Sequence, residues 1–258
     1  MATAQHSSND TEGRRAPATR LPLTRRHWNI LGVIALLASV FALGVAWAVS
    51  SPVGGSPDDD YHLASIWCTP PLSESGCETG YTEEDTYGPV VPETIASNRV
   101  ACYAFHGESS AACVYNLSDE RTAVTDRWDD GNYPWGYYQF HHHFIAHDTH
   151  RAALTMRIIN WGIAVLLLGG IAALMPSFLR RGYVVAMAAA WTPMGIYFIA
   201  SNNPSSWAFS GVLAFAAGLW SAANSEGWRR WSLLGGAAIG PFEFILLNIV
   251  TLGCVIFF

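Results

Sequence analysis

Five long apolar stretches constrain this chain more than any other feature of its sequence. The first, residues 28–49, contains no charged side chain. A helix of that length crosses the roughly 30 Å hydrocarbon core of a bilayer. Four more apolar stretches follow, at residues 158–175, 183–200, 207–223 and 233–258. The pattern predicts an all-α integral membrane protein with about five transmembrane helices.

The composition of the chain agrees with a membrane protein and excludes other classes. Charged residues make up 13% of the chain and hydrophobic residues 51%, whereas about 25% of the residues of soluble domains are charged. Every basic residue is an arginine, and the net charge is −6. No nucleic-acid partner is expected, because such a partner needs basic charge to displace the counterions of its phosphates. The expected partner is the lipid bilayer.

Arginine clusters indicate how the chain is oriented in the membrane. They lie before the first apolar stretch, between the second and third, and between the fourth and fifth: Arg14, Arg15, Arg20, Arg25, Arg26; Arg180, Arg181; Arg229, Arg230. Short cytoplasmic segments carry the excess of positive charge. We therefore expect residues 1–27 to form a disordered cytoplasmic tail, residues 50–154 an extracytoplasmic loop domain, and residues 155–258 transmembrane helices two to five. A cleaved signal peptide is the alternative for residues 28–49, although their uncharged run exceeds the usual 7–15 or so apolar residues.

The predicted loop domain is acidic and contains most of the cysteines. It has sixteen acids against four arginines, and it holds Cys68, Cys77, Cys102 and Cys113. An even number of cysteines in an exported segment predicts disulfides. Of the three possible pairings we favour Cys68–Cys77 with Cys102–Cys113, since each closes a short loop that contains glycine. A four-cysteine zinc site is the alternative, but the two-residue gaps of such sites are missing. Cys254, in the last apolar stretch, is expected to be a free thiol.

An acidic motif directly follows the first apolar stretch. Ser56 suits the N-cap of a helix, Pro57 its first position and Asp59 its third. Asp58 and His62 would then be neighbours on one helix face. Acids in a first turn offset the positive end of the helix dipole, which explains one carboxylate well. Because three consecutive acids exceed that need, the motif has two interpretations, a helix cap or a functional carboxylate–imidazole group.

Aromatic residues and histidines lie before the second apolar stretch. The aromatic residues of segment 133–138 form either a membrane-interface belt or a surface on which a sugar ring stacks. His143, His147 and His150 recur at a spacing that places them on one helix face, where His142 and Asp148 would complete a metal site. Solvated histidines are the alternative, so the metal ligands stay unassigned.

Four of these segments together resemble a known family. They are residues 55–68, the Tyr-Pro pair at 133–134, residues 156–160, and residues 203–206. Their order and side of the membrane resemble a domain-of-unknown-function family, number twenty-one forty-two, of bacterial multi-pass membrane proteins. That family is similar in turn to the membrane-embedded glycosyltransferases of the GT-C type. The resemblance covers the N-terminal half of such proteins, so we expect this sequence to be a fragment or a shortened member.

The resemblance implies a function and a set of roles. A GT-C-like protein of the bacterial plasma membrane would transfer a sugar from a polyprenyl-phosphate donor to an acceptor glycan of the cell envelope. Asp58 would act as the general base or hold a divalent cation against the donor phosphate, with Asp59 and His62 in support. Arg151 or Arg157 would neutralise the lipid phosphate, the alternative being that both are interfacial anchors.

The second hypothesis is a non-catalytic membrane subunit or a transporter. Glu243 lies near the middle of the last apolar stretch. A carboxyl group at that depth is costly unless it is partnered or beside water, so we expect Glu243 to face protein or a polar path.

Overall fold

The computed structural model describes residues 25–104, 107–133 and 135–239. Most of the expected N-terminal tail lies outside these residues, as do Glu243 and Cys254. The described chain is mainly helical. The predicted helical class is therefore confirmed in its main feature.

The chain divides into two compact units, Met1–Leu36 and Leu37–Phe258. The described part of the first unit is the beginning of helix α1 (Arg25–Ser50), and the helix continues into the second unit. In the first unit large apolar side chains such as Ile34 are exposed. A helix that is apolar on all sides needs either a protein core or lipid around it, and residues Asn29–Ser50 are long and apolar enough to be a candidate membrane span.

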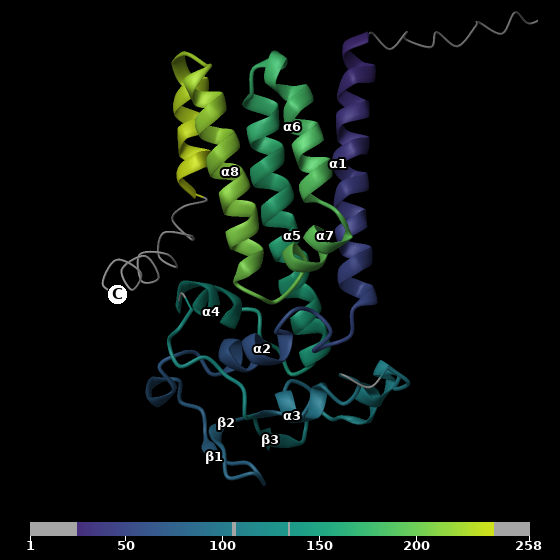
Figure 1. The fold of residues 1–258 in the computed structure, drawn as a ribbon, viewed down its shortest axis with the longest axis vertical. Coiled ribbons are helices and arrows are strands. Elements are labelled where there is room, and N and C mark those ends of the chain that lie inside the picture. Colours follow the sequence, from purple (N-terminus) through teal and green to yellow (C-terminus); the bar gives the residue numbers. More distant parts are fainter. Residues whose placement is uncertain (1–24, 105–106, 134, 240–258) are drawn as a thin grey trace, which may run out of the picture. The chain divides into compact units, whose positions relative to one another are not determined.

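Two further helices in the second unit are also long and apolar enough to span a membrane, α5 (Thr149–Leu174) and α8 (Ser205–Ala223). In Figure 1 they run side by side, and α6 (Ser177–Ala190) lies on the other side of α5 from α8. A further helix begins at residue 227 and is described to residue 239. Three of the described helices are thus long and apolar enough to span a membrane. The number is four if α6 and the short helix that follows it, which form a bent pair, count as one span. The rest of the fifth expected span lies outside the described residues.

The bent pair corrects the expectation of a continuous third span over residues 183–200. Helix α6 ends at Ala190, and α7 (Pro193–Ile199) continues at an angle of 81°. Proline lacks the N–H that a helix needs, and it pushes the residue before it into an extended conformation. Thr192 accordingly has φ −64° and ψ 169°, and its side chain accepts a hydrogen bond from the Gly195 N–H. The sequence therefore starts a new helix at this point.

Residues 51–148, here called the loop region, connect α1 to α5 and gather at one end of α5 and α8 (Figure 1). Its elements are α2 (Asp59–Trp67), η1 (Leu72–Glu74), β1 (Thr79–Tyr81), β2 (Tyr87–Pro92), α3 (Ser97–Val100), η2 (Ala111–Asn116), β3 (Thr122–Val124) and α4 (Trp135–His142). The three strands form an antiparallel sheet in the order β1-β2-β3, with Thr79 opposite Pro89 and Val90 opposite Val124. This small sheet was not part of the all-α expectation.

The core of the loop region includes the first turns of α5. Leu63 and Ile66 of α2 are fully buried, together with Tyr138 of α4. Ala153 and Met156 of α5 belong to the same apolar cluster and are also fully buried. Helix α5 therefore anchors the loop region as well as forming a candidate span.

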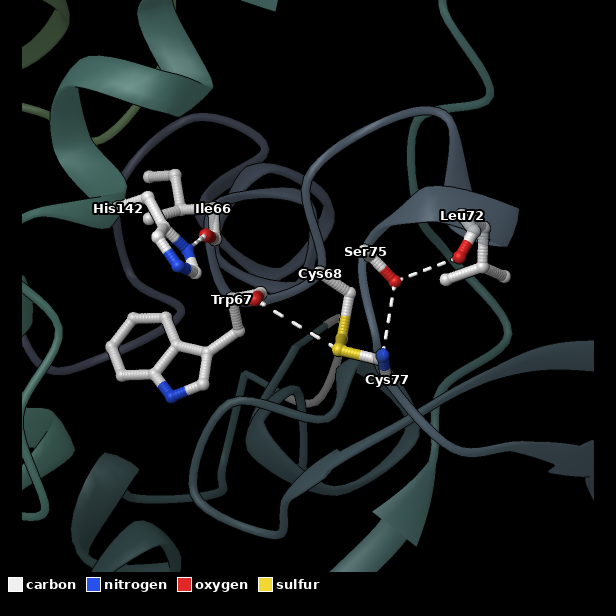
Figure 2. The surroundings of a disulfide bond; sticks show 7 residues. All are labelled: Ile66, Trp67, Cys68, Leu72, Ser75, Cys77 and His142. Carbon is white, nitrogen blue, oxygen red and sulfur yellow. Dashed lines mark hydrogen bonds between the residues drawn. A yellow bond between two sulfur atoms is a disulfide. The ribbon is translucent and has the colours of Figure 1, made fainter.

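Both favoured disulfides are present. Cys68 pairs with Cys77, and Cys102 pairs with Cys113, with Cα–Cα distances of 5.8 and 6.3 Å. Figure 2 shows the first of them at the end of α2, where His142 of α4 also lies with its Nδ1 2.7 Å from the Ile66 carbonyl oxygen. The disulfide and the α4 histidine together fix the C-terminal end of α2.

Candidate functional site at the start of α2

Helix α2 begins later than the sequence predicted. Its N-cap is Asp58 rather than Ser56, and Asp58 has φ 50° and ψ 26° without a capping hydrogen bond from its side chain. This left-handed conformation is uncommon for residues other than glycine, although aspartate tolerates it better than most. The predicted cap at Ser56 is wrong because the carboxylates of the motif face partners elsewhere in the chain. Asp59, for example, accepts a hydrogen bond from the Gly54 N–H at 3.0 Å.

Asp59 is fully buried and forms an ion pair with Arg157 of α5. The Arg157 guanidinium also donates to the carbonyl oxygens of Ser51 and Pro52, at 2.7 and 2.9 Å. Arg157 is 1% exposed. A buried charge is tolerated only when it is paired and hydrogen-bonded, as here. Asp59 and Arg157 therefore join α2, α5 and the chain that leaves α1, and this guanidinium is not presented to a lipid phosphate.

Asp58 and Asp60 share a different cation, Arg127. The guanidinium lies 3.1 Å from an Asp58 oxygen and 2.6 Å from an Asp60 oxygen. The Asp58 side chain is 54% exposed, whereas that of Asp60 is 11% exposed. Burial raises the pKa of Asp60, and Arg127 partly opposes that shift. Of the three acids, Asp58 is the one that stands open to a ligand.

His62 does not pair with Asp58, as the predicted helix face would have required. Its Nδ1 lies 2.9 Å from the Tyr138 hydroxyl of α4, and burial lowers its pKa to about 3. The rings of Tyr61 and Tyr133 pack edge-on against it, with centroids 5.0 and 4.8 Å away. His62 is therefore a neutral, buried side chain at pH 7. Its role in the structure is to pack against the rings of Tyr61 and Tyr133.

Two further segments, the turn before α8 and part of α5, also belong to this region. The place where these segments meet the acidic motif is here called the junction. Asn203, before α8, donates from Nδ2 to the Pro57 carbonyl at 3.0 Å. Asn160 of α5 donates to the Ser201 carbonyl at 2.7 Å and accepts from Trp207 Nε1 at 2.8 Å. The acidic motif, the Tyr133 segment, the start of α5 and the turn before α8 therefore meet in one place, although they are far apart in the sequence.

The family model of predicted membrane proteins designated DUF2142 matches residues 41–240. The chain belongs to this family. No curated protein and no solved structure matches the chain. The range that matches the family model contains α2, α5, α8 and the whole junction between them. The convergence of four separated segments is thus a property of the part that this chain shares with the DUF2142 family.

The three histidines considered as metal ligands lie in different parts of the chain's fold. His143 follows α4, His147 lies in the connection and His150 is in α5, so the three do not share the predicted helix face. Within residues 25–104, 107–133 and 135–239, no group of three or more His, Cys, Asp or Glu side chains is placed to hold a metal. The three acids of the motif instead face arginines.

The two arginines proposed for phosphate binding lie in different surroundings. The Arg151 side chain is 84% exposed and pairs with Asp148 at 3.0 Å, one turn earlier. Arg157 is held by Asp59 inside the protein. Only Arg151 is therefore open to a phosphate.

Arg127 is the site residue that the sequence did not suggest. Its guanidinium contacts both Asp58 and Asp60 and lies 5.8 Å from the centre of the Tyr61 ring. A weak signal was present, because Arg127 is one of only four arginines in a segment with sixteen acids. Nothing in the spacing of residues 58 and 127 indicated that they meet.

Proposed function

We propose that this protein is a membrane-embedded glycosyltransferase-like enzyme that uses a polyprenyl-phosphate-linked sugar for cell-envelope glycan assembly, with Asp58 as general base. The observation that carries the proposal is the contrast within the acidic motif. Asp59 is buried in an ion pair, whereas Asp58 is exposed and held in a left-handed conformation. Unusual backbone conformations cluster at functional sites. The resemblance to GT-C enzymes, which carry an acidic pair after the first span, supports the same residue.

The proposed chemistry is a displacement at the anomeric carbon of the sugar. Asp58 accepts the proton of an acceptor hydroxyl, the hydroxyl oxygen bonds to the anomeric carbon, and the bond from that carbon to the phosphate oxygen breaks. Polyprenyl phosphate leaves with the electron pair. The pair between Asp58 and Arg127 is half-exposed and therefore weak, so an acceptor hydroxyl can replace Arg127 at the carboxylate. The nearby Tyr61 and Tyr133 rings provide faces on which a sugar stacks.

The proposed location is the bacterial plasma membrane, with the N-terminus in the cytoplasm and the loop region outside. The two disulfides support it, because disulfides persist in oxidising compartments. The arginines at 180–181 and 229–230, which flank the membrane helices at the opposite ends, support the same orientation.

The test is transfer activity of the purified chain in nanodiscs. The probes are synthetic polyprenyl-phosphate-linked pentoses and hexoses, and the readout is release of polyprenyl phosphate that depends on an added glycan acceptor. We expect Asp58→Asn to lower the rate by about 10²-fold or more, as for a lost general base. Asp130→Asn, a change at an exposed acid of the same region, is the matched control and should keep the rate. Wild-type activity in Asp58→Asn, or no release with any donor, contradicts the proposal.

One observation favours a transporter as the second candidate. The 81° break between α6 and α7 resembles the discontinuous helices that line transport sites. Flux of a labelled polyprenyl-phosphate sugar across proteoliposomes, without sugar transfer, would favour this candidate. Transfer that depends on Asp58 would exclude it.

A further inference from the structure

A cleft of about 350 Å³ lies beside the small sheet of the loop region. It is lined by the end of β1 with the turn that follows, by α3, and by β3 with the residues after it. In Figure 1 these elements lie on the side of the loop region away from α5 and α8. The site around Asp58 uses none of the side chains that line this cleft, so the cleft is a separate feature.

The sides of the cleft are held by contacts within the protein. A Cβ at Gly80 would lie 2.9 Å from the Val124 Cγ2 atom, so glycine lets β1 approach β3 this closely. Asn98 Nδ2 donates to the Val124 carbonyl at 3.1 Å and ties α3 to β3. The Thr82 hydroxyl accepts from the Thr86 N–H at 3.1 Å and closes the turn after β1. Because these sides are fixed before a ligand arrives, the ordering cost of binding is low.

The side chains that line the cleft keep hydrogen-bonding capacity of both kinds. Glu84 has no hydrogen-bond or ion-pair partner within the described residues. The Arg99 guanidinium lies 3.9 Å from Glu83, too far for a hydrogen bond, and both side chains are exposed, so the pair is weak. Asp126 accepts from the Ser97 hydroxyl through one carboxylate oxygen and leaves the other available. The cleft therefore offers donors as well as acceptors to a ligand.

An aromatic ring lies among these polar groups. Tyr81 is 65% exposed, and its ring packs against that of Tyr87, with the centroids 5.5 Å apart. A tyrosine ring supplies a large, rigid contact surface at a low cost in conformational entropy. The face of such a ring is negative, so it attracts the C–H groups on one side of a sugar ring.

These features match an uncharged sugar better than an ion. Each sugar hydroxyl both donates and accepts a hydrogen bond, and the cleft offers carboxylates beside a guanidinium and an amide. An anion is repelled by Glu83, Glu84 and Asp126, and a cation is repelled by Arg99. The volume lies at the lower end of the roughly 300–1,000 Å³ of small-molecule pockets, which suits a short segment of a glycan.

The cleft is next to the Asp58 site along the chain. Asp126 lines the cleft, and the following residue, Arg127, pairs with Asp58 at 3.1 Å. Consecutive Cα atoms are about 3.8 Å apart. The two sites therefore flank one short segment, and a glycan chain longer than the cleft can extend from one site to the other.

We infer that this cleft binds an uncharged oligosaccharide and holds the acceptor glycan behind the sugar that reacts at Asp58. The role of this glycan as acceptor rests on the proposed function, whereas binding in the cleft does not. Contacts remote from the reacting group supply binding energy that lowers the barrier to transfer. The cleft therefore makes long acceptors better substrates than single sugars.

The first test is binding of the full chain in nanodiscs to an array of uncharged, acidic and amine-bearing oligosaccharides. We expect selective binding of uncharged ones. In calorimetric titration with the best of them, Tyr81→Ala should weaken binding about tenfold, as for a lost aromatic contact, whereas Tyr81→Phe keeps the ring and the affinity. Tyr115→Ala, at an exposed tyrosine of the loop region outside the cleft, is the matched control. No binding, or binding that survives Tyr81→Ala, overturns the inference.

A second variant distinguishes a sugar from a cation. Glu84→Gln removes the charge but keeps an oxygen that accepts from a sugar hydroxyl, so binding should change little, as it should when salt is added. Loss of binding in Glu84→Gln with strong salt dependence, or selective binding of amine-bearing glycans, would assign the cleft to a cationic ligand. Selective binding of acidic glycans would equally overturn the choice of an uncharged one.

Transfer assays separate this inference from the proposed function. Tyr81→Ala should lower kcat/KM about tenfold for an oligosaccharide acceptor and leave transfer to a single-sugar acceptor unchanged. Asp58→Asn should abolish transfer yet keep glycan binding. Binding that depends on Tyr81 in a protein without transfer activity supports the cleft and contradicts the proposed function. Transfer that depends on Asp58 but has the same rate in Tyr81→Ala for every acceptor overturns the acceptor role of the cleft alone.

Discussion

Asp59 and Arg157 are 98 residues apart in the chain and form an ion pair inside the protein. The guanidinium has further partners in the Ser51 and Pro52 carbonyls. Replacing both members of such a pair by apolar residues is often tolerated, whereas removing one leaves a buried charge without compensation. At the scale of single residues, Asp59 therefore compensates the buried charge of Arg157, whereas Asp58 is the acid of the motif that is open to solvent.

We expect Arg157→Met to lower the free energy of unfolding by about 3–5 kcal/mol, because it leaves the Asp59 carboxylate buried and unpaired. Chemical unfolding in detergent micelles, followed by circular dichroism, measures this change. The double variant Asp59→Leu with Arg157→Met should be less destabilised than Arg157→Met alone. A loss in the double variant equal to the sum of the losses in Asp59→Leu and Arg157→Met would show that the two side chains act independently.

The lowered pKa of His62 determines how the free energy of unfolding should depend on pH. Burial lowers its pKa to about 3 from an ordinary value of 6.5, so below pH 6.5 the unfolded chain takes up a proton that the folded chain does not bind. The stabilisation is complete above pH 6.5 and is lost progressively as the pH falls towards 3. Burial lowers the pKa of His141 to about 4, which acts in the same direction.

The measurement is the free energy of unfolding between pH 7.5 and 5. Each such histidine adds a slope of up to about 1.4 kcal/mol per pH unit below 6.5. His62→Asn should reduce that slope. His147→Asn, at an exposed histidine, should leave it unchanged. A slope that His62→Asn does not alter would mean that the imidazole is protonated in the folded state.

At the scale of elements, α2 is held at both ends. Its start is fixed by the ion pairs with Arg157 and Arg127, and its end by the Cys68–Cys77 disulfide and by His142. A short helix of nine residues is marginal on its own. These contacts with other segments therefore determine where α2 lies and which way Asp58 faces.

Each disulfide should contribute about 2–3 kcal/mol to the loop region, since closing a loop of roughly ten residues removes that much chain entropy from the unfolded state. Cys102→Ser with Cys113→Ser should accordingly lower the midpoint of unfolding. Peptide mapping without reduction checks the pairing. Four alkylatable thiols in the native loop region would refute both bridges.

The sequence predicted the features that local interactions determine. It did not predict those that depend on contacts between residues far apart in the chain. The long helices and the favoured disulfides followed from local patterns, namely uncharged length and cysteine spacing. The start of α2 did not, because the side chains that draw the acids away from a capping role are Arg127 and Arg157, far along the chain. The sheet was missed because β2 contains Pro89 and Pro92 and is only six residues long. Pro193 made the limits of the third span uncertain, but the 81° bend there was not predicted, because the hydropathy is continuous across it.

At the scale of the whole molecule, the testable property is which side of the membrane the loop region occupies. We expect alkaline phosphatase fused after Asp119 to be active and a fusion after Arg181 to be inactive, because disulfides and arginine clusters indicate opposite sides for these positions. A β-galactosidase series at the same positions is the control and should give the reverse pattern. Activity of phosphatase at Arg181 alone would place the loop region in the cytoplasm.

The Asp59–Arg157 pair also has a consequence for biogenesis. Arg157 lies in the first half of α5, a candidate span, and an arginine costs up to about 2.5–3.5 kcal/mol on insertion scales, the value for the centre of a membrane helix. The partners that lower this cost are Asp59 and the carbonyls of Ala48, Ser51 and Pro52, and they are synthesised well before α5. We therefore expect the nascent chain to export the loop region first and to insert α5 only when Arg157 contacts these partners. Late steps of translocation and early steps of tertiary folding are then one event.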